Sequence, residues 1–147
     1  MRLFRPSETV PSIFEIDFPR LYEQGKRAVI FDLDKTLGGR RPTRLEPSVV
    51  NLLERLADMG FRIGVLTNRR RVVRDPVIEQ LSKRYPLHHR ARKPSKNGFL
   101  TLLSAMGVSP HQAVVVGDRR LTDIFGANRL AIHSIRVRPW RGDRFSS

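Results

Sequence analysis

Two aspartates, Asp32 and Asp34, stand one residue apart at the end of the apolar run AVIF. Alternate residues of an extended chain point to the same side, so we expect both carboxylates to face one place. A chain with 28 basic and only 14 acidic residues thus sets two like charges side by side. Such a pair repels unless a cation lies between the charges. The stretch FDLDKTL is therefore the first candidate for a catalytic site.

Further polar residues follow other apolar runs or lie close after FDLD. In chain order they are Thr36, Thr67, Asn68, Lys93, Gly117, Asp118 and Asp123. If the apolar runs are parallel strands, their carboxyl ends meet at one edge of a sheet. Carboxylates gathered there suit a hard cation such as Mg²⁺, and the lysine and a threonine hydroxyl would face a negatively charged ligand. The combination predicts phosphoryl transfer, with a carboxylate available as the nucleophile.

Apolar periodicity indicates the elements that would hold these residues. Short, continuously apolar runs predict strands at 28–31, 61–66, 87–89, 113–116 and 132–137. Apolar residues spaced three and four apart predict helices at 47–59 and 96–106, with shorter ones from Pro76 and over 122–129. Because strand and helix alternate, we expect an α/β fold, a three-layer α/β/α sandwich with a mostly parallel, Rossmann-like sheet.

The length predicts one domain over residues 1–147. We divide it into an N-terminal lead (1–27), a core (28–137) and a loose C-terminal tail (138–147). An apolar stripe in the lead is expected to pack onto the sheet: Phe14, Phe18, Leu21 and Tyr22. The segments from Thr36 to Thr67 and from Thr67 to Lys93 are each filled by one helix and one strand. Neither leaves room for a cap domain, so an open site is expected.

The motifs run in the order DxDx[TV], S/T, K and GDxxxxD, which resembles the haloacid dehalogenase (HAD) superfamily of aspartate-nucleophile phosphatases. The stretches SIFEIDF, FDLDKTL, ARKPS and VVVGDRRLTDIFGANRL further resemble its small capless subclass IIIA, which includes phosphatidylglycerophosphate phosphatases. This resemblance implies that Asp32 is the nucleophile and Asp34 the general acid and base. It also implies phosphate binding by Thr67, Asn68 and Lys93, and a Mg²⁺ ion held by Asp32, the backbone carbonyl of Asp34, and Asp118. Supporting residues would be Thr36, Gly117 and Asp123, the last as an outer metal ligand or as the group that orients Lys93.

The formal net charge of +14 points to a polyanionic partner. Arginines flank all four motifs and are expected to ring the mouth of the site: Arg40, Arg41, Arg69, Arg70, Arg71, Arg90, Arg92, Arg119 and Arg120. Such a rim would suit an anionic membrane surface, so we predict phosphatidylglycerophosphate as the substrate, recognised through its anionic phospholipid head group. A nucleic-acid 3′-phosphate is the alternative, because a basic groove also suits single strands. An alternative of another class is a non-catalytic RNA- or ribosome-binding module on the same fold.

The chain has no cysteine, which excludes disulfides and thiolate metal sites. It has no run of about 18 apolar residues, and its N-terminus lacks the apolar core of a signal peptide. We therefore expect a cytoplasmic protein, peripheral on the inner face of the membrane. The tandem His88 and His89 is not expected to bind metal, because adjacent strand residues point to opposite faces.

Overall fold

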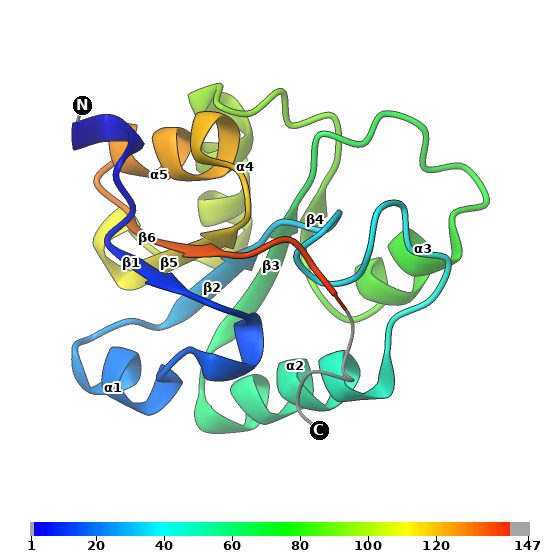
Figure 1. The fold of residues 1–147 in the computed structure, drawn as a ribbon, viewed down its shortest axis with the longest axis horizontal. Coiled ribbons are helices and arrows are strands. Elements are labelled where there is room, and N and C mark those ends of the chain that lie inside the picture. Colours follow the sequence, from blue (N-terminus) through cyan, green and yellow to red (C-terminus); the bar gives the residue numbers. More distant parts are fainter. Residues whose placement is uncertain (1, 142–147) are drawn as a thin grey trace.

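A wholly parallel sheet forms the centre of the protein (Figure 1). The computed structural model describes residues 2–141, and in this range the sheet has the order β1-β6-β5-β2-β3-β4. The strands are β1 (Glu8–Val10), β2 (Ala28–Phe31), β3 (Arg62–Leu66), β4 (Leu87–His88), β5 (Ala113–Gly117) and β6 (His133–Val137). The expected α/β architecture is confirmed, and the sheet is parallel throughout.

Helices cover both faces of this sheet, as Figure 1 shows. The α-helices are α1 (Phe18–Glu23), α2 (Pro47–Met59), α3 (Pro76–Ser82), α4 (Lys96–Met106) and α5 (Phe125–Arg129). Short turns are η1 (Arg2–Phe4), η2 (Ile13–Glu15), η3 (Pro110–Gln112) and the π-helical turn η4 (Arg120–Ile124). Helices α1 to α3 pack on one face, and α4 and α5 pack on the other. These three layers are the predicted sandwich.

The two central strands are buried along their whole length. β2 reads AVIF and β5 reads AVVVG, and every residue of both is buried. Continuous apolar runs of this kind are typical of strands covered on both faces. Phe31 pairs with Val65 on one side and Val116 on the other, so the three neighbouring strands end together. Side chains that follow these strands therefore emerge at one edge.

Helix α2 has the predicted bounds, and its sequence explains both of its ends. Pro47 occupies the first turn, where a missing N–H costs nothing. Gly60 ends the helix with φ 107°, a left-handed conformation that residues with a β-carbon avoid. The apolar stripe lies against the sheet through four buried side chains, Val49, Leu52, Leu53 and Leu56. Helix α2 thereby fixes the connection between β2 and β3.

The N-terminal lead belongs to the packed structure. β1 pairs with β6 at the edge of the sheet, with Glu8 opposite Ile135. In α1, Phe18 and Leu21 are buried. The rings of Phe18 and Tyr22 form T-shaped pairs with the Phe61 ring, with centroids 5.9 and 5.3 Å apart. The expected packing of these three residues is confirmed, whereas Phe14 stays 38% exposed. None of these elements of the lead was predicted.

The beginning of the expected C-terminal tail contacts the core. The backbone N–H of Trp140 donates to the backbone carbonyl of Lys35 at 2.8 Å, and the centroid of the Trp140 ring lies 6.1 Å from that of Phe14. Residues 142–147 of the tail lie outside the described range.

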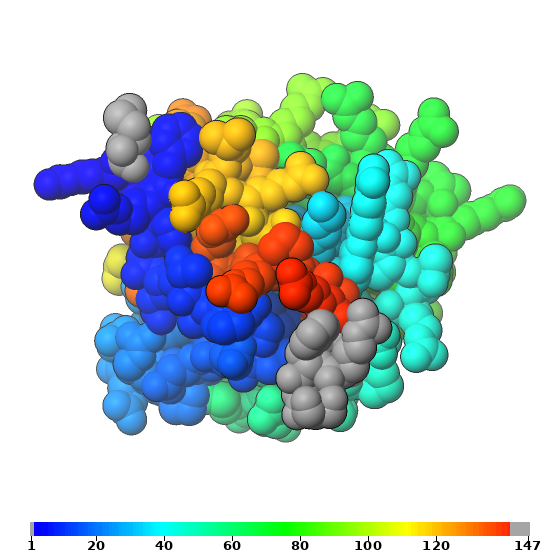
Figure 2. All heavy atoms as spheres, in the orientation of Figure 1, coloured from blue at the N-terminus to red at the C-terminus, as the bar shows by residue number. Residues whose placement is uncertain are grey.

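Among residues 2–141, no cap domain covers the edge of the sheet at which β2, β3 and β5 end. The connection from β2 to β3 contains α2, and that from β3 to β4 contains α3, with no further folded unit in either. In Figure 2, the residues after β2 (cyan) and after β3 (green) form neighbouring projections on the right of the molecule. Within residues 2–141, no helix is long and apolar enough to cross a membrane.

Candidate active site

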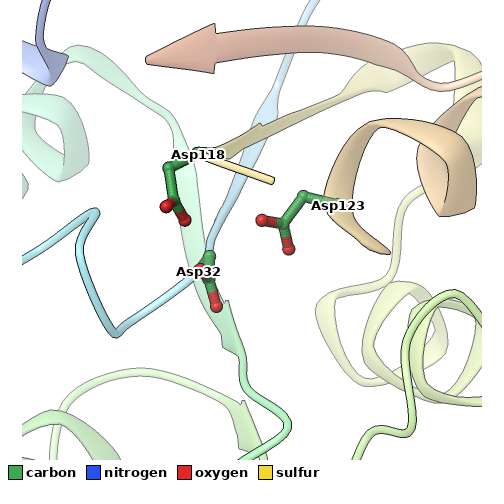
Figure 3. A group of neighbouring side chains, drawn as sticks. All are labelled: Asp32, Asp118 and Asp123. Atoms are coloured by element: carbon green, nitrogen blue, oxygen red, sulfur yellow. The ribbon is translucent and has the colours of Figure 1, made fainter. Parts of the chain in front are cut away.

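Three aspartates meet beyond the ends of β2 and β5. Asp32 follows β2, Asp118 follows β5, and Asp123 belongs to η4; Figure 3 shows the three side chains close together. One oxygen from each lies within 4.8 Å of the others. The Asp32 N–H donates to the Val116 carbonyl at 2.9 Å, which extends the pairing of β2 with β5 to the aspartate itself. The pairing of two buried strands thus positions the carboxylate expected to be the nucleophile.

Lys93 enters the same cluster from the loop after β4. Its ammonium donates to Asp32 Oδ1 at 2.7 Å, to Asp123 Oδ1 at 2.6 Å and to the Leu66 carbonyl at 3.0 Å. The side chain is 4% exposed. Burial alone would lower the pKa of the Lys93 ammonium, but the charges of Asp123 and Asp32 outweigh burial and raise it. Lys93 is therefore a fixed cation at this edge.

One ammonium does not balance three carboxylates. Burial raises the pKa of Asp32 to about 6, because the lowering effect of Lys93 is smaller than burial and the Asp123 charge together. Burial and the charge of Asp32 likewise raise the pKa of Asp118. Asp118 Oδ1 is buried and accepts no hydrogen bond from the described residues. An oxygen left free among clustered carboxylates fits a hard divalent cation, so these residues fit Mg²⁺.

Gly117 makes room for Asp123. An ideal β-carbon at position 117 would lie 2.6 Å from the β-carbon of Asp123 and closer still to its carboxylate. Asp123 uses both of its oxygens, since Oδ1 accepts from Lys93 and Oδ2 accepts from the Arg119 N–H at 3.2 Å. The hydrogen bond to Lys93 is the contact expected of a group that orients this lysine.

The loop after β3 contributes Thr67 and Asn68. Thr67 is buried, lines the hollow at this edge, and its hydroxyl oxygen accepts from the Arg69 N–H at 3.1 Å. Asn68 holds the backbone of Lys93, because its Oδ1 accepts from the Lys93 N–H at 2.7 Å. The Asn68 side chain therefore joins the second motif to the third. Thr36 is buried, has no hydrogen-bond partner for its hydroxyl among the described residues, and does not line the hollow.

Asp34 lies on the turn after Asp32, and both line the same hollow. Its carboxylate forms an ion pair with Arg69 and also accepts from the Arg41 N–H at 3.0 Å. Arg69 forms a second ion pair with Asp75, and its side chain is only 8% exposed. The sequence indicated Arg69 as one of several rim arginines, whereas the structure places it as a buried link between two carboxylates.

The hollow at this edge has a volume of ≈ 700 Å³. Six of the expected rim arginines line it: Arg40, Arg41, Arg69, Arg70, Arg71 and Arg119. Arg90 and Arg92 instead line a second, smaller hollow, and Arg120 lines neither. Lys35 and Thr122 also line the main hollow, although the sequence had assigned them no role. Their place beside Asp34 and Asp123 in the motifs was the signal that could have found them.

Known proteins with similar sequences are phosphatases or related hydrolases. The family model of haloacid dehalogenase-like hydrolases matches residues 4–130. "Probable phosphatase YqeG" of Bacillus subtilis is 30% identical over 138 residues, covering 94% of this chain and 79% of that protein. "Phosphatidylglycerophosphate phosphatase 1, chloroplastic" of Chlamydomonas reinhardtii is 29% identical over 145 residues, covering 91% of this chain. The chain spans 52% of the length of that second relative.

Solved structures share the fold. A HAD-superfamily hydrolase from Ehrlichia chaffeensis has a TM-score of 0.65 at 14% identity, covering 82% of this chain and 95% of that one. A HAD phosphatase from Thermococcus onnurineus has a TM-score of 0.59 at 27% identity, covering 68% of this chain and 50% of that one.

Proposed function

Since the chain belongs to the haloacid dehalogenase-like hydrolases and is a phosphatase of that family, we propose that it works through a phosphoryl-aspartate on Asp32. The observation that carries this proposal is the Lys93 ammonium, which hydrogen-bonds Asp32 and Asp123 at one end of the aspartate cluster. A non-catalytic binding module has no use for a buried lysine arranged in this way, so that alternative is dropped.

In the first step a carboxylate oxygen of Asp32 attacks phosphorus. The new oxygen–phosphorus bond forms as the bond to the leaving alkoxide breaks, and Asp34 donates a proton to that oxygen. Lys93 and Thr67 bind oxygens of the transferred phosphoryl group, because both line the hollow that Asp32 also lines. Lys93 stays protonated and contributes charge only.

In the second step Asp34, now a carboxylate, takes a proton from water. The water oxygen attacks phosphorus, the bond from phosphorus to Asp32 breaks, and inorganic phosphate leaves. Asp32 is again a carboxylate and Asp34 again carries its proton, so the cycle closes. Both residues line one hollow, which puts the water and the leaving group within reach of the same acid and base.

A Mg²⁺ ion would be held by Asp32, Asp118 and the backbone carbonyl of Asp34. It would offset the negative charge of the aspartates and of the phosphate. Asp118 is the ligand that the structure supports most directly, through its buried and unpartnered Oδ1.

For the substrate we propose phosphatidylglycerophosphate, presented at an anionic membrane surface to which the protein binds peripherally. The similarity to the Chlamydomonas enzyme supports this substrate class. The open site supports it too, because no cap encloses a small metabolite and a large substrate must cover the hollow itself. The arginines around the hollow suit an anionic surface, where each basic residue contributes about 1 kcal/mol.

Two assays test the proposal in order. Hydrolysis of p-nitrophenyl phosphate should require Mg²⁺, should stop with EDTA, and should fall by several orders of magnitude in Asp32→Asn. Equal activity of wild type and Asp32→Asn would contradict the mechanism. Turnover of phosphatidylglycerophosphate in anionic vesicles is then compared with turnover of a 3′-phosphorylated oligonucleotide. Faster turnover of the oligonucleotide, without vesicle binding at low salt, would make the lipid assignment wrong.

A further inference from the structure

A second hollow adjoins the catalytic one and is lined by arginine alone. Its volume is ≈ 150 Å³ and its walls are Arg70, Arg90 and Arg92. Arg70 also lines the catalytic hollow, so the two spaces share a wall. No position of this second hollow has a carboxylate, in contrast to the aspartate-lined site beside it.

These three arginines lack a carboxylate partner among residues 2–141, whereas their neighbour has two; the Arg90 Nε–H donates to the Arg70 carbonyl at 3.4 Å. Arg69 forms ion pairs with Asp34 and Asp75. Within residues 2–141, none of Arg70, Arg90 and Arg92 forms an ion pair. Three like charges around one space repel one another, and an anion in that space would turn the repulsion into attraction. The guanidinium fork can bind two phosphate oxygens at once, which the point charge of an ammonium does not do.

The backbone fixes two of these arginines in place. The Arg90 N–H donates to the Arg69 carbonyl at 3.0 Å, and the buried Ala91 donates to the Thr67 carbonyl at 3.0 Å. Both Arg90 and Arg92 adopt left-handed conformations, with φ of 53° and 54°. Residues with a β-carbon hold that conformation only where their surroundings impose it. The segment is tied to the strand end that carries Thr67, and it leads directly into Lys93.

We propose that this hollow binds a second phosphate of the substrate, a phosphodiester joined to the phosphomonoester that is cleaved at Asp32. The inference rests on the proposed function and deepens it. Phosphatidylglycerophosphate has both groups, the monoester at one end of a glycerol and the diester at the other. The diester would bind at Arg70, Arg90 and Arg92 while the monoester occupies the catalytic hollow.

A contact to a group that does not react strengthens binding of substrate and transition state alike. The hollow should therefore set the preference between substrates through KM, and it should leave the chemistry at Asp32 to the aspartates and Lys93. A monoester that lacks the diester gains nothing from Arg90 and Arg92, which line only the second hollow.

The test compares two water-soluble compounds, which removes membrane binding from the measurement. Glycerophosphoglycerol phosphate, the deacylated head group, has the monoester and the diester, and glycerol 3-phosphate has the monoester alone. The quantity measured is the ratio of their kcat/KM values. In Arg90→Gln/Arg92→Gln this ratio should fall about tenfold, as expected for loss of charge-assisted hydrogen bonds. The fall should come from a higher KM for the diester compound.

Arg55→Gln is the matched control. It removes the same charge from an exposed position on α2, outside both hollows. Because Arg55 lines neither hollow and its charge is exposed to solvent and screened by salt, the variant should keep the wild-type ratio. An unchanged ratio in the double variant, or the same fall in Arg55→Gln, would overturn the subsite.

Two further outcomes distinguish an error in the proposed ligand of this hollow from an error in the proposed function. In the first, the double variant lowers kcat/KM for a 3′-phosphorylated dinucleotide relative to glycerol 3-phosphate, but not kcat/KM for the deacylated head group. That result would assign the hollow to nucleic acid and overturn the lipid diester. Absence of Mg²⁺-dependent p-nitrophenyl phosphate hydrolysis in the wild type would refute the proposed function itself. That second result is obtained without any change to the three arginines.

Discussion

Arg69 and Asp34 form an ion pair between the loops that follow β3 and β2. The same guanidinium is paired with Asp75, whose Oδ1 accepts from the Val77 and Ile78 N–H groups at 3.1 Å and so begins α3. The proposed acid and base of the reaction is thereby connected to a helix N-terminus through one buried side chain. Its position depends on Arg69 as well as on its own loop.

We expect Arg69→Ala to lower kcat by about tenfold, because Asp34 loses the group that orients it. The loss should be larger for phenyl phosphate than for p-nitrophenyl phosphate, since the poorer leaving group needs the proton more. Arg69→Lys keeps the charge but not the planar guanidinium fork, so its kcat should lie between those of the wild type and Arg69→Ala. An equal loss on both substrates would mean that Arg69 supports the loop and not proton transfer.

The aspartate cluster should make the stability of the metal-free protein depend on pH. Asp32 has a folded pKa of about 6, raised above its ordinary value, and the pKa of Asp118 is raised as well. Between the ordinary and the raised pKa values the folded state binds more protons than the unfolded state, so stability falls as the pH rises through about 6. The increase in Tm caused by Mg²⁺ over EDTA should therefore be greater at about pH 7.5 than at about pH 5.

Asp32→Asn provides the control for that measurement. It removes the carboxylate whose pKa is raised to about 6, so the dependence of the Mg²⁺ effect on pH should weaken. A Mg²⁺ effect that is constant over this pH range in the wild type would contradict the assignment of the cluster as the metal site.

Gly117→Ala should impair catalysis through Asp123. The added β-carbon would overlap the Asp123 side chain and displace the carboxylate that orients Lys93. Overpacking of this kind costs about 1–3 kcal/mol, so Tm should fall together with kcat. Gly39→Ala is the matched control, because its β-carbon would meet nothing closer than Trp140 Cδ1 at 3.8 Å. Full activity of Gly117→Ala would show that Asp123 has little influence on Lys93.

Glu8 should stabilise the protein at neutral pH. Its carboxylate accepts from Arg20 Nη2 at 2.7 Å and lies 2.6 Å from His133 Nε2. Burial raises the pKa of Glu8, but the hydrogen bonds and charges of Arg20 and His133 lower it by more. A depressed carboxyl pKa gives stability that is present above the unfolded pKa and lost as the pH falls through the folded one.

Glu8→Gln should therefore lower the free energy of unfolding by about 1–2 kcal/mol at pH 7, and by less in acid. Glu23→Gln, a change of the same kind near the end of α1, should have little effect. Urea unfolding of the wild type and both variants, at pH 7 and in acid, measures these changes in the free energy of unfolding. Equal destabilisation in acid would show that the charge of Glu8 is not what matters.

Much of the framework could be predicted because its signals are local. The strand at 28–31 and the helices at 47–59 and 96–106 have the predicted bounds. Apolar spacing defines all three, and the glycines at 60 and 107 mark the ends of the two helices, without reference to the rest of the chain. The gathering of Asp32, Lys93 and Asp118 followed from the rule that parallel strands end at one edge.

Other features depend on partners that are distant in the sequence. Residues 8–10 become a strand only by pairing with β6, and three residues carry too little periodicity to indicate it. In the run Arg69, Arg70, Arg71 the three side chains are chemically identical. Their different positions, one buried and two exposed, depend on where Asp34 and Asp75 lie in the folded chain.

The place of β1 outside β6 also determines the order in which a nascent chain can complete its sheet. Glu8 is separated by 125 residues from His133, which begins β6, the strand that β1 pairs with. At about 5–20 residues per second, synthesis reaches β6 roughly 6–25 s after β1. Every aspartate of the site and Lys93 precede β6 in the chain. All of the catalytic side chains therefore leave the ribosome before β6 does, and the first strand stays without its partner until β6 follows.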